Sequence, residues 1–148
     1  FCTASLGGAI LGGGSDEEIR NLRDYGYNLG MAYQIYDDIL DYTANSETLG
    51  KPSGNDLLGG VITLPAIIAY ENGSKELIDK FISSKQSIRE EMISDLINEI
   101  NKTGAVEKTK QIADKHIYET QKILLSLPNN RNLESLKLLS DYVGTRSY

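Results

Sequence analysis

The sequence has few of the residues from which several common kinds of site are built. Its 148 residues include one cysteine and one histidine, and tryptophan is missing. A single cysteine, Cys2, excludes a disulfide framework and a multi-cysteine zinc site. The longest uncharged apolar stretch, residues 57–70, is interrupted by two glycines and Pro65. It therefore falls short of the ~20 residues that a membrane-spanning helix needs.

Positive charge is also scarce. The chain has 15 lysines and arginines against 21 aspartates and glutamates, which gives a formal net charge of −6. This balance argues against a protein that binds nucleic acid. Hydrophobic residues make up 40% of the chain and charged residues 24%, which is ordinary for a folded protein. A chain of this length buries roughly 70% of its unfolded surface, enough for one core.

The first residues, 1–11, are apolar and small, and this segment ends at residues 12–14, which are three glycines. No basic residues precede the segment, as a secretory signal peptide would require. Such a start is typical of a chain that begins inside a buried helix. We therefore expect a fragment of a longer protein, and a chain trimmed to its ordered part is the alternative.

Helical signals follow one another along the chain. Ser15 and Glu18 match a capping box, which predicts a long helix to about Tyr42. Residues 45–60 carry four glycines and a proline and predict a loop, long enough to suggest a function. Further helices are expected over residues 64–73, 76–83, 88–102, 105–127 and 133–143. Without an alternating strand pattern, the chain is predicted to be an all-α helical bundle.

One face of the first long helix is acidic. Residues 25–36 are uncharged, and Asp37, Asp38 and Asp41 then follow within five positions. At ~100° per residue, Gln34 and the three aspartates share an arc of about 100°. The opposite side of the helix is filled by Leu29, Ala32, Tyr33, Ile35, Tyr36, Ile39 and Leu40.

These clustered carboxylates favour a divalent cation. Like charges one turn apart repel, and an unpaired buried carboxylate is costly. Oxygen ligands on one helical face suit Mg²⁺, which takes one or two carboxylates and keeps several waters. A solvated acidic face is the alternative, but the uncharged residues before it indicate a helix buried on most sides. A calcium loop of the EF-hand type fits poorly, because Tyr42 and Thr48 replace its glycine and glutamate.

The following loop adds one positive charge. Lys51 is the only cation between Arg23 and Lys75, and glycines lie on both sides of it. A lysine beside three aspartates is well placed to meet a phosphate oxygen. Taken alone, a surface lysine would be the simpler interpretation. A P-loop is excluded, because its pattern of glycines and its preceding strand are both missing.

Residues 30–65 resemble the second aspartate-rich region of the trans-isoprenyl diphosphate synthases, the polyprenyl synthetase family. The shared pattern is a glutamine three residues before Asp-Asp-x-x-Asp, then Gly-Lys-x-x-Gly-x-Asp, then Thr-x-Pro. Asp-Asp-x-x-Asp alone is a weak signal, and the ordered combination is a strong one. The matching residues are Gln34, Asp37, Asp38, Asp41, Gly50, Lys51, Gly54, Asp56, Thr63 and Pro65.

The resemblance implies an isoprenoid-synthase helical bundle around a deep cavity, in which two aspartate-rich motifs hold Mg²⁺ on an allylic diphosphate. Asp37 and Asp41 would hold one ion, Asp38 would contact it through water or from just outside the coordination shell, and Asp56 would also lie just outside that shell. Metal and lysine charge would stabilise the departing pyrophosphate and leave an allylic carbocation.

The same resemblance implies the substrates. Gln34 and Lys51 would contact the diphosphate, and isopentenyl diphosphate would attack the carbocation to build linear polyprenyl diphosphates. No nucleic-acid partner and no transmembrane segment are expected. The full-length form would be a homodimer in the cytoplasm, or alternatively in the plastid stroma.

The departures from the family matter as well. The chain has one Asp-Asp-x-x-Asp; the first aspartate-rich motif, the basic residues for isopentenyl diphosphate and a Lys-Thr-Ala motif belong upstream in this family. Residues 1–148 are therefore expected to be the C-terminal portion of one polyprenyl synthetase domain, inactive alone.

Three alternatives stay open: a class I terpene cyclase, a non-catalytic helical subunit of a heteromeric synthase, and an acidic helical domain without a ligand. The Gly-Lys-x-x-Gly-x-Asp loop favours chain elongation over the cyclase. The intact aspartates argue against a non-catalytic subunit.

Overall fold

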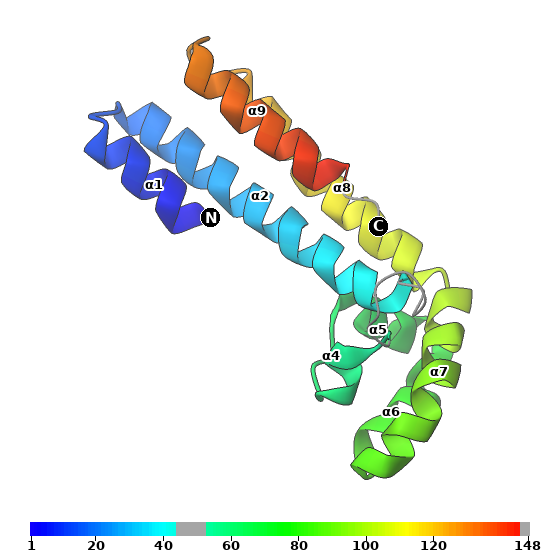
Figure 1. Cartoon of the computed structure of the whole chain (residues 1–148). Helices are drawn as coiled ribbons and strands as arrows, with labels where there is room; N and C mark the ends of the chain where they lie inside the picture. The colour runs from blue at the N-terminus through cyan, green and yellow to red at the C-terminus, as the bar shows by residue number, and fades with distance from the viewer. Residues whose placement is uncertain (44–52, 146–148) are drawn as a thin grey trace. The chain divides into compact units, whose positions relative to one another are not determined.

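The computed structural model describes residues 1–43 and 53–145, and these residues form helices and no strand. The all-α prediction is therefore confirmed for this part of the chain. The elements are α1 (Cys2–Leu11), α2 (Asp16–Thr43), α4 (Asn55–Leu58), α5 (Leu64–Ala69), the π-helical turn η1 (Tyr70–Ser74), α6 (Lys75–Ser83), α7 (Gln86–Lys102), α8 (Ala105–Leu124) and α9 (Arg131–Gly144) (Figure 1).

The described residues divide into two compact units. Unit 1 combines residues 1–34 with residues 112–145, and unit 2 contains residues 35–111. Helix α2 supplies residues to both units, and its end, with the three aspartates, belongs to unit 2. In the described ranges, no helix combines the length and the apolar character needed to cross a membrane.

In unit 1, α1 lies closely against the first half of α2 (Figure 1). Two glycines of α2 make this contact possible. A Cβ atom at Gly26 would lie 2.6 Å from the hydroxyl of Ser5 and 2.8 Å from the carbonyl oxygen of Phe1. A Cβ atom at Gly30 would lie 3.1 Å from that of Phe1. The two helices therefore approach each other where α2 has no side chains.

Two long-range hydrogen bonds join α2 to α8 and α9 within unit 1. The hydroxyl of Tyr25 donates to the carbonyl oxygen of Leu136 at 3.0 Å, and burial raises the pKa of Tyr25 to about 12. Nδ1 of His116 lies 2.9 Å from Oδ1 of Asn28. The single histidine is thus half-buried between two helices, where it holds α8 to α2.

The predicted capping box opens α2. The backbone N–H and the hydroxyl of Ser15 both donate to Oε2 of Glu18 at 2.8 Å. The N–H of Glu18 donates in return to the Ser15 hydroxyl at 3.3 Å. These bonds satisfy polar groups that a helix start otherwise leaves without partners.

Glu18→Gln should lower the free energy of unfolding at neutral pH. The N–H of Ser15, followed by its hydroxyl, lowers the pKa of the Glu18 carboxyl below its ordinary value of 4.5. A carboxyl with a lowered pKa in the folded state stabilises that state above the unfolded pKa, and the contribution is lost as the pH falls through the folded pKa. Urea denaturation should therefore show a lower free energy of unfolding for Glu18→Gln than for the wild type at neutral pH, and nearly equal values in strong acid. An equal difference at both values would contradict this explanation.

Unit 2 has its own core under α5, α6 and α7. Pro65 lies in the first turn of α5, as predicted, because a helix start needs no N–H there. Gly73 lies inside η1 and interrupts the helical backbone there with φ +113°, a conformation that suits glycine. The buried core residues are Tyr42, Leu57, Ala66, Ala69, Ile78, Phe81, Leu96, Ile97, Ile100 and Ala105.

Several details of the helix predictions are wrong. Residues 55–58, which were predicted to belong to a loop, form α4, and α8 ends at Leu124 rather than at residue 127. The helix predicted over residues 88–102 starts earlier, because α7 begins at Gln86, with Lys85 at its N-cap. The reason is tertiary, because the Arg89 guanidinium donates to the carbonyl oxygens of Phe81 and Ile82 and holds the start of α7 against α6.

The helix predicted over residues 133–143 is present as α9, but several of its apolar residues are not buried. Leu133 and Val143 are buried, but Leu139 and Tyr142 are 42% and 61% exposed. The small, fully buried Ser140 lies between the buried positions instead. The buried face of α9 therefore follows helical spacing from Leu133. Leu139 and Tyr142 are apolar but lie off this face, so hydrophobicity alone does not predict their exposure.

Candidate functional site

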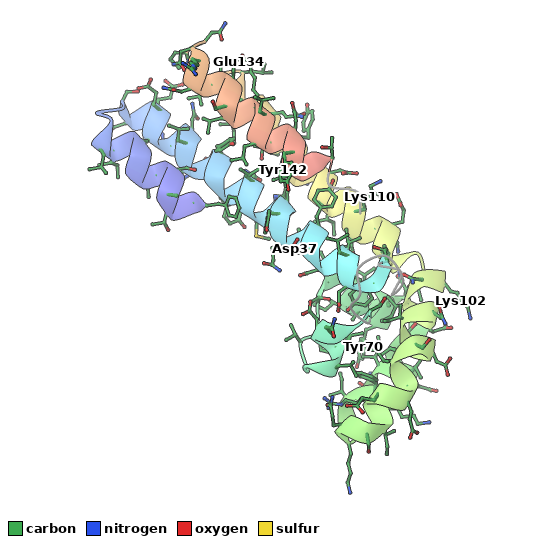
Figure 2. The ribbon with its side chains drawn as sticks, in the orientation of Figure 1. Asp37, Tyr70, Lys102, Lys110, Glu134 and Tyr142 are labelled. Carbon is green, nitrogen blue, oxygen red and sulfur yellow. The ribbon has the colours of Figure 1, made fainter. Side chains whose placement is uncertain are left out.

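The end of α2 separates apolar from acidic residues as its sequence predicts. Ile35, Tyr36 and Ile39 are buried on one side, at 5%, 6% and 8% exposure. Asp37 lies on α2 (Figure 2), and it is half-buried, as are Asp38 and Asp41. The carboxylates therefore lie at the edge of a packed helix rather than fully in solvent.

Asp41 contacts the backbone where the chain begins α4. Its Oδ1 accepts the N–H of Asn55 and its Oδ2 accepts the N–H of Asp56, both at 3.0 Å. Its carbonyl oxygen accepts the N–H of Gly54 at 2.8 Å. One residue of α2 thus binds three successive residues, although more than ten positions separate them in the sequence.

Gly54 fits this position because it has no side chain. Its φ is +84°, which disfavours residues with a Cβ atom, and it is buried. A Cβ atom there would lie 2.6 Å from the side chain of Ile93 and 2.8 Å from that of Ile97. The start of α4 is therefore held between the end of α2 and the face of α7.

Tyr42 gives the same region a second support. Its hydroxyl shares a 2.8 Å hydrogen bond with the hydroxyl of Thr63, and Nδ2 of Asn101 donates to its carbonyl oxygen at 3.3 Å. Burial, with a smaller effect of nearby carboxylates such as Asp41, raises the pKa of Tyr42 to about 12. The phenol thus stays neutral beside the acidic residues.

Asp56 joins the three aspartates of the motif. Burial raises the pKa of its carboxyl first, and the negative charges of Asp41, Asp38 and Asp37 raise it further. These four carboxylates therefore repel one another in a partly buried place. A bound cation would relieve this repulsion.

The donor set fits Mg²⁺ in its chemistry. The ion needs only one or two carboxylates, with waters or phosphate oxygens as its other ligands. Asp37 and Asp38 can supply them from one turn of α2. Across residues 1–43 and 53–145, no three acidic, histidine or cysteine side chains gather as a complete ligand set. The remaining ligands would therefore come from elsewhere, as the resemblance implies.

Of the two predicted diphosphate-binding residues, the structure describes Gln34 but not Lys51. Gln34 lies on α2, is exposed, and is the last residue of unit 1 in this helix. Lys51 lies outside the described residues, so its role stays a prediction. The supports from Tyr42 and Asn101 were not predicted. Asn101 has no sequence signal, and Thr63 was visible only as part of the Thr-x-Pro pattern.

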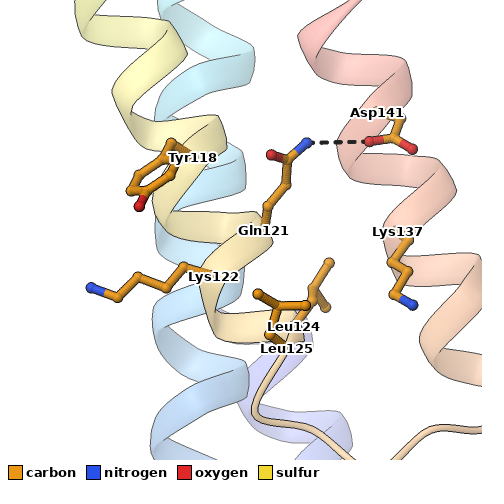
Figure 3. Close-up of a pocket in the computed structure, with 7 residues that line it drawn as sticks. All are labelled: Tyr118, Gln121, Lys122, Leu124, Leu125, Lys137 and Asp141. Carbon is orange, nitrogen blue, oxygen red and sulfur yellow. Dashed lines mark hydrogen bonds between the residues drawn. The ribbon is translucent and has the colours of Figure 1, made fainter.

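A separate cavity of about 410 Å³ lies between α8 and α9 in unit 1 (Figure 3). The side chain of Gln121 donates to Oδ1 of Asp141 at 3.3 Å and joins the two helices there. Lys122 and Lys137 line the cavity, and each pairs with a glutamate of its own helix. The cavity thus combines apolar surface with lysines that are already paired.

Comparison with known proteins agrees with the predicted family and fold. The sequence model of the family described as polyprenyl synthetase matches residues 1–100. The chain therefore belongs to the polyprenyl synthetase family. It is 38% identical over 141 residues to heptaprenyl diphosphate synthase component 2 of Bacillus subtilis (strain 168). This match covers 95% of the chain and 40% of the Bacillus protein.

Solved structures give the same result. Heptaprenyl diphosphate synthase from Staphylococcus aureus matches with a TM-score of 0.88 at 28% identity, over 98% of this chain and 45% of that one. Polyprenyl synthase from Caulobacter crescentus, complexed with calcium and isoprenyl diphosphate, matches with a TM-score of 0.81 at 34% identity, over 99% and 45%. The fold is thus that of the isoprenoid synthases, and the chain spans less than half the length of these relatives.

Proposed function

We propose that this chain is part of a prenyltransferase that joins an allylic diphosphate to isopentenyl diphosphate and makes linear polyprenyl diphosphates. Its family supports this proposal, because the relatives are named as prenyl diphosphate synthases. One observation carries it: the half-buried carboxylates at the end of α2 share their surroundings with Asp56. Family membership also favours chain elongation over cyclisation.

Residues 1–148 would supply the C-terminal portion of the catalytic domain. The second aspartate-rich motif is present, and the first motif and the basic residues for isopentenyl diphosphate would lie elsewhere in the domain. We therefore expect the 148-residue chain to be inactive by itself. The full-length product of the gene that encodes this chain is the protein to assay.

The proposed roles follow from chemistry. Magnesium, when bound, neutralises the diphosphate and stabilises the departing pyrophosphate. Asp37, Asp38 and Asp41 form the acidic face that would hold it. Gln34 and Lys51 would bind diphosphate oxygens, and the uncharged side of α2 would keep water from the reacting carbons.

The test of this function is product formation. The full-length gene product, given an allylic diphosphate, isopentenyl diphosphate and Mg²⁺, should release linear polyprenyl diphosphates, and a chelator should stop the reaction. Cyclised hydrocarbons, or turnover that a chelator does not change, would contradict the proposal.

A heteromeric assembly is a second candidate, favoured by the name of the Bacillus relative, a component of its synthase. A homodimer is the assembly that the resemblance implies for the full-length form. Light scattering of the purified full-length protein, with and without added cell extract from its source, separates a homodimer from a protein that needs another subunit.

Lys51→Ala should weaken the affinity for allylic diphosphate by at least about tenfold, because one charge-assisted contact contributes roughly 1.5–3 kcal/mol. Calorimetric titration at low salt with Mg²⁺ present measures this change. Lys80→Ala is the matched control, since Lys80 is an exposed lysine of α6. Equal dissociation constants for Lys51→Ala and the wild type would remove Lys51 from the site.

A further inference from the structure

The geometry points to a positioning role for Asp41: its carboxylate holds the start of α4, with Asp56, against the end of α2 and does not bind the divalent cation directly. This inference rests on the proposed function and separates the three aspartates of the motif into two tasks. Sequence spacing treats them alike, because all of them lie on one helical face.

The carboxylate of Asp41 already has two partners. Each of its oxygens accepts one backbone N–H at 3.0 Å, from Asn55 and from Asp56. These are among the first N–H groups of α4, which have no acceptor within their own helix. The N-cap residue, Gly54, has no side chain to accept them. Asp41 therefore caps α4 from another helix.

The backbone of Asp41 supports the same role. Its carbonyl oxygen accepts the N–H of Gly54 at 2.8 Å, so side chain and main chain bind three consecutive residues. Gly54 is confined in turn by Ile93 and Ile97 of α7. Since α4 is held on both sides, moving the Asp41 carboxylate toward a metal ion would leave two N–H groups without partners.

Asp56 is the residue through which Asp41 would act on the reaction. Its N–H is fixed by Oδ2 of Asp41, so its Cα has a set place beside α2. Its carboxyl is close enough to Asp38 and Asp37 to be repelled by their negative charges. Loss of the Asp41 contact would move this carboxylate and change the field at the cation site, although the ligands on α2 would still be present.

Three variants of the full-length gene product test this role: Asp41→Asn, Asp41→Glu and Asp37→Asn. Amide hydrogen exchange at residues 54–56 should be at least about tenfold faster in both Asp41 variants and unchanged in Asp37→Asn. Turnover per folded molecule should fall in all three. Folded protein is measured by circular dichroism, so that a loss of stability alone does not count as a loss of turnover.

Mn²⁺ binding in the presence of pyrophosphate, followed by electron paramagnetic resonance, separates ligand from positioning residue. Asp41→Glu keeps the charge, so its dissociation constant should stay within about threefold of wild type, since it changes no ligand. Asp37→Asn and Asp41→Asn each remove one charge, and the Asp37 variant should bind at least about tenfold more weakly than the other, because it also loses a ligand.

The inference would be overturned, and Asp41 would be a ligand, if Asp37→Asn and Asp41→Asn weakened Mn²⁺ binding equally and amide hydrogen exchange at residues 54–56 did not change. Faster exchange with wild-type turnover in the Asp41 variants would overturn the effect on the reaction. A wild-type protein that binds neither Mn²⁺ nor pyrophosphate overturns the cation part of the inference together with the proposed function. The exchange rates then still decide whether Asp41 holds α4.

Discussion

Replacing Asp37 with alanine in the full-length gene product should lower turnover by about 10²–10³-fold while the protein stays folded. Asp37 lies at the half-buried edge of α2, and its carboxylate contributes to the repulsion that raises the pKa of Asp56. Removing it takes away a proposed Mg²⁺ ligand and relieves repulsion between like charges. We therefore expect activity to fall without a loss of stability, a pattern typical of functional sites.

The measurement is steady-state turnover at saturating Mg²⁺, together with thermal unfolding of the same sample. Asp24→Ala is the matched control, because Asp24 is also an aspartate of α2 and pairs with Arg23 at the surface. The control should change turnover by less than about twofold, as surface ion pairs contribute little. Turnover like that of the wild type in Asp37→Ala would rule out a role for Asp37 in catalysis.

Gly54→Ala should destabilise the protein by about 2–5 kcal/mol. The left-handed backbone of this residue, with φ +84°, costs a residue with a Cβ atom roughly 1–2 kcal/mol. The new methyl group would also overlap Ile93 and Ile97, and such overpacking costs about 1–3 kcal/mol. Urea denaturation measures the sum.

Gly60→Ala is the control for this substitution. Gly60 also has φ +84°, but the nearest side-chain atom to its Cβ position would be 3.9 Å away, on Arg89. The control should therefore lose only the backbone part of the stability. If both variants lost equal stability, the contact of Gly54 with α7 would carry no energetic weight.

Local sequence signals predicted most of the fold. The capping box of Ser15 and Glu18, Pro65 in the first turn of α5, and the spacing of the aspartates depend on neighbours within one or two turns. Those features appear where they were expected. The start of α7 was missed because Arg89 fixes it through α6, which no local pattern contains.

The candidate site was predictable to the same extent. Helical spacing predicted that Asp37, Asp38 and Asp41 share one face of the helix, and the structure shows that all three are half-buried. It could not reveal that Asp41 binds the backbone at Asn55, since this contact depends on where the chain returns after the intervening loop. Whether an aspartate of this motif caps another helix therefore depends on tertiary contacts, which the local sequence does not contain.

The two glycines on the face of α2 that contacts α1 affect how this helix forms. Glycine inside a helix costs about 1 kcal/mol relative to alanine, and α2 contains Gly26 and Gly30 one turn apart. An isolated α2 peptide would fray in its middle for this reason. Docking of α1 covers those two positions and supplies the missing contacts. We therefore expect α1 and the first half of α2 to fold together, because their contact offsets the helix-weakening effect of the two glycines.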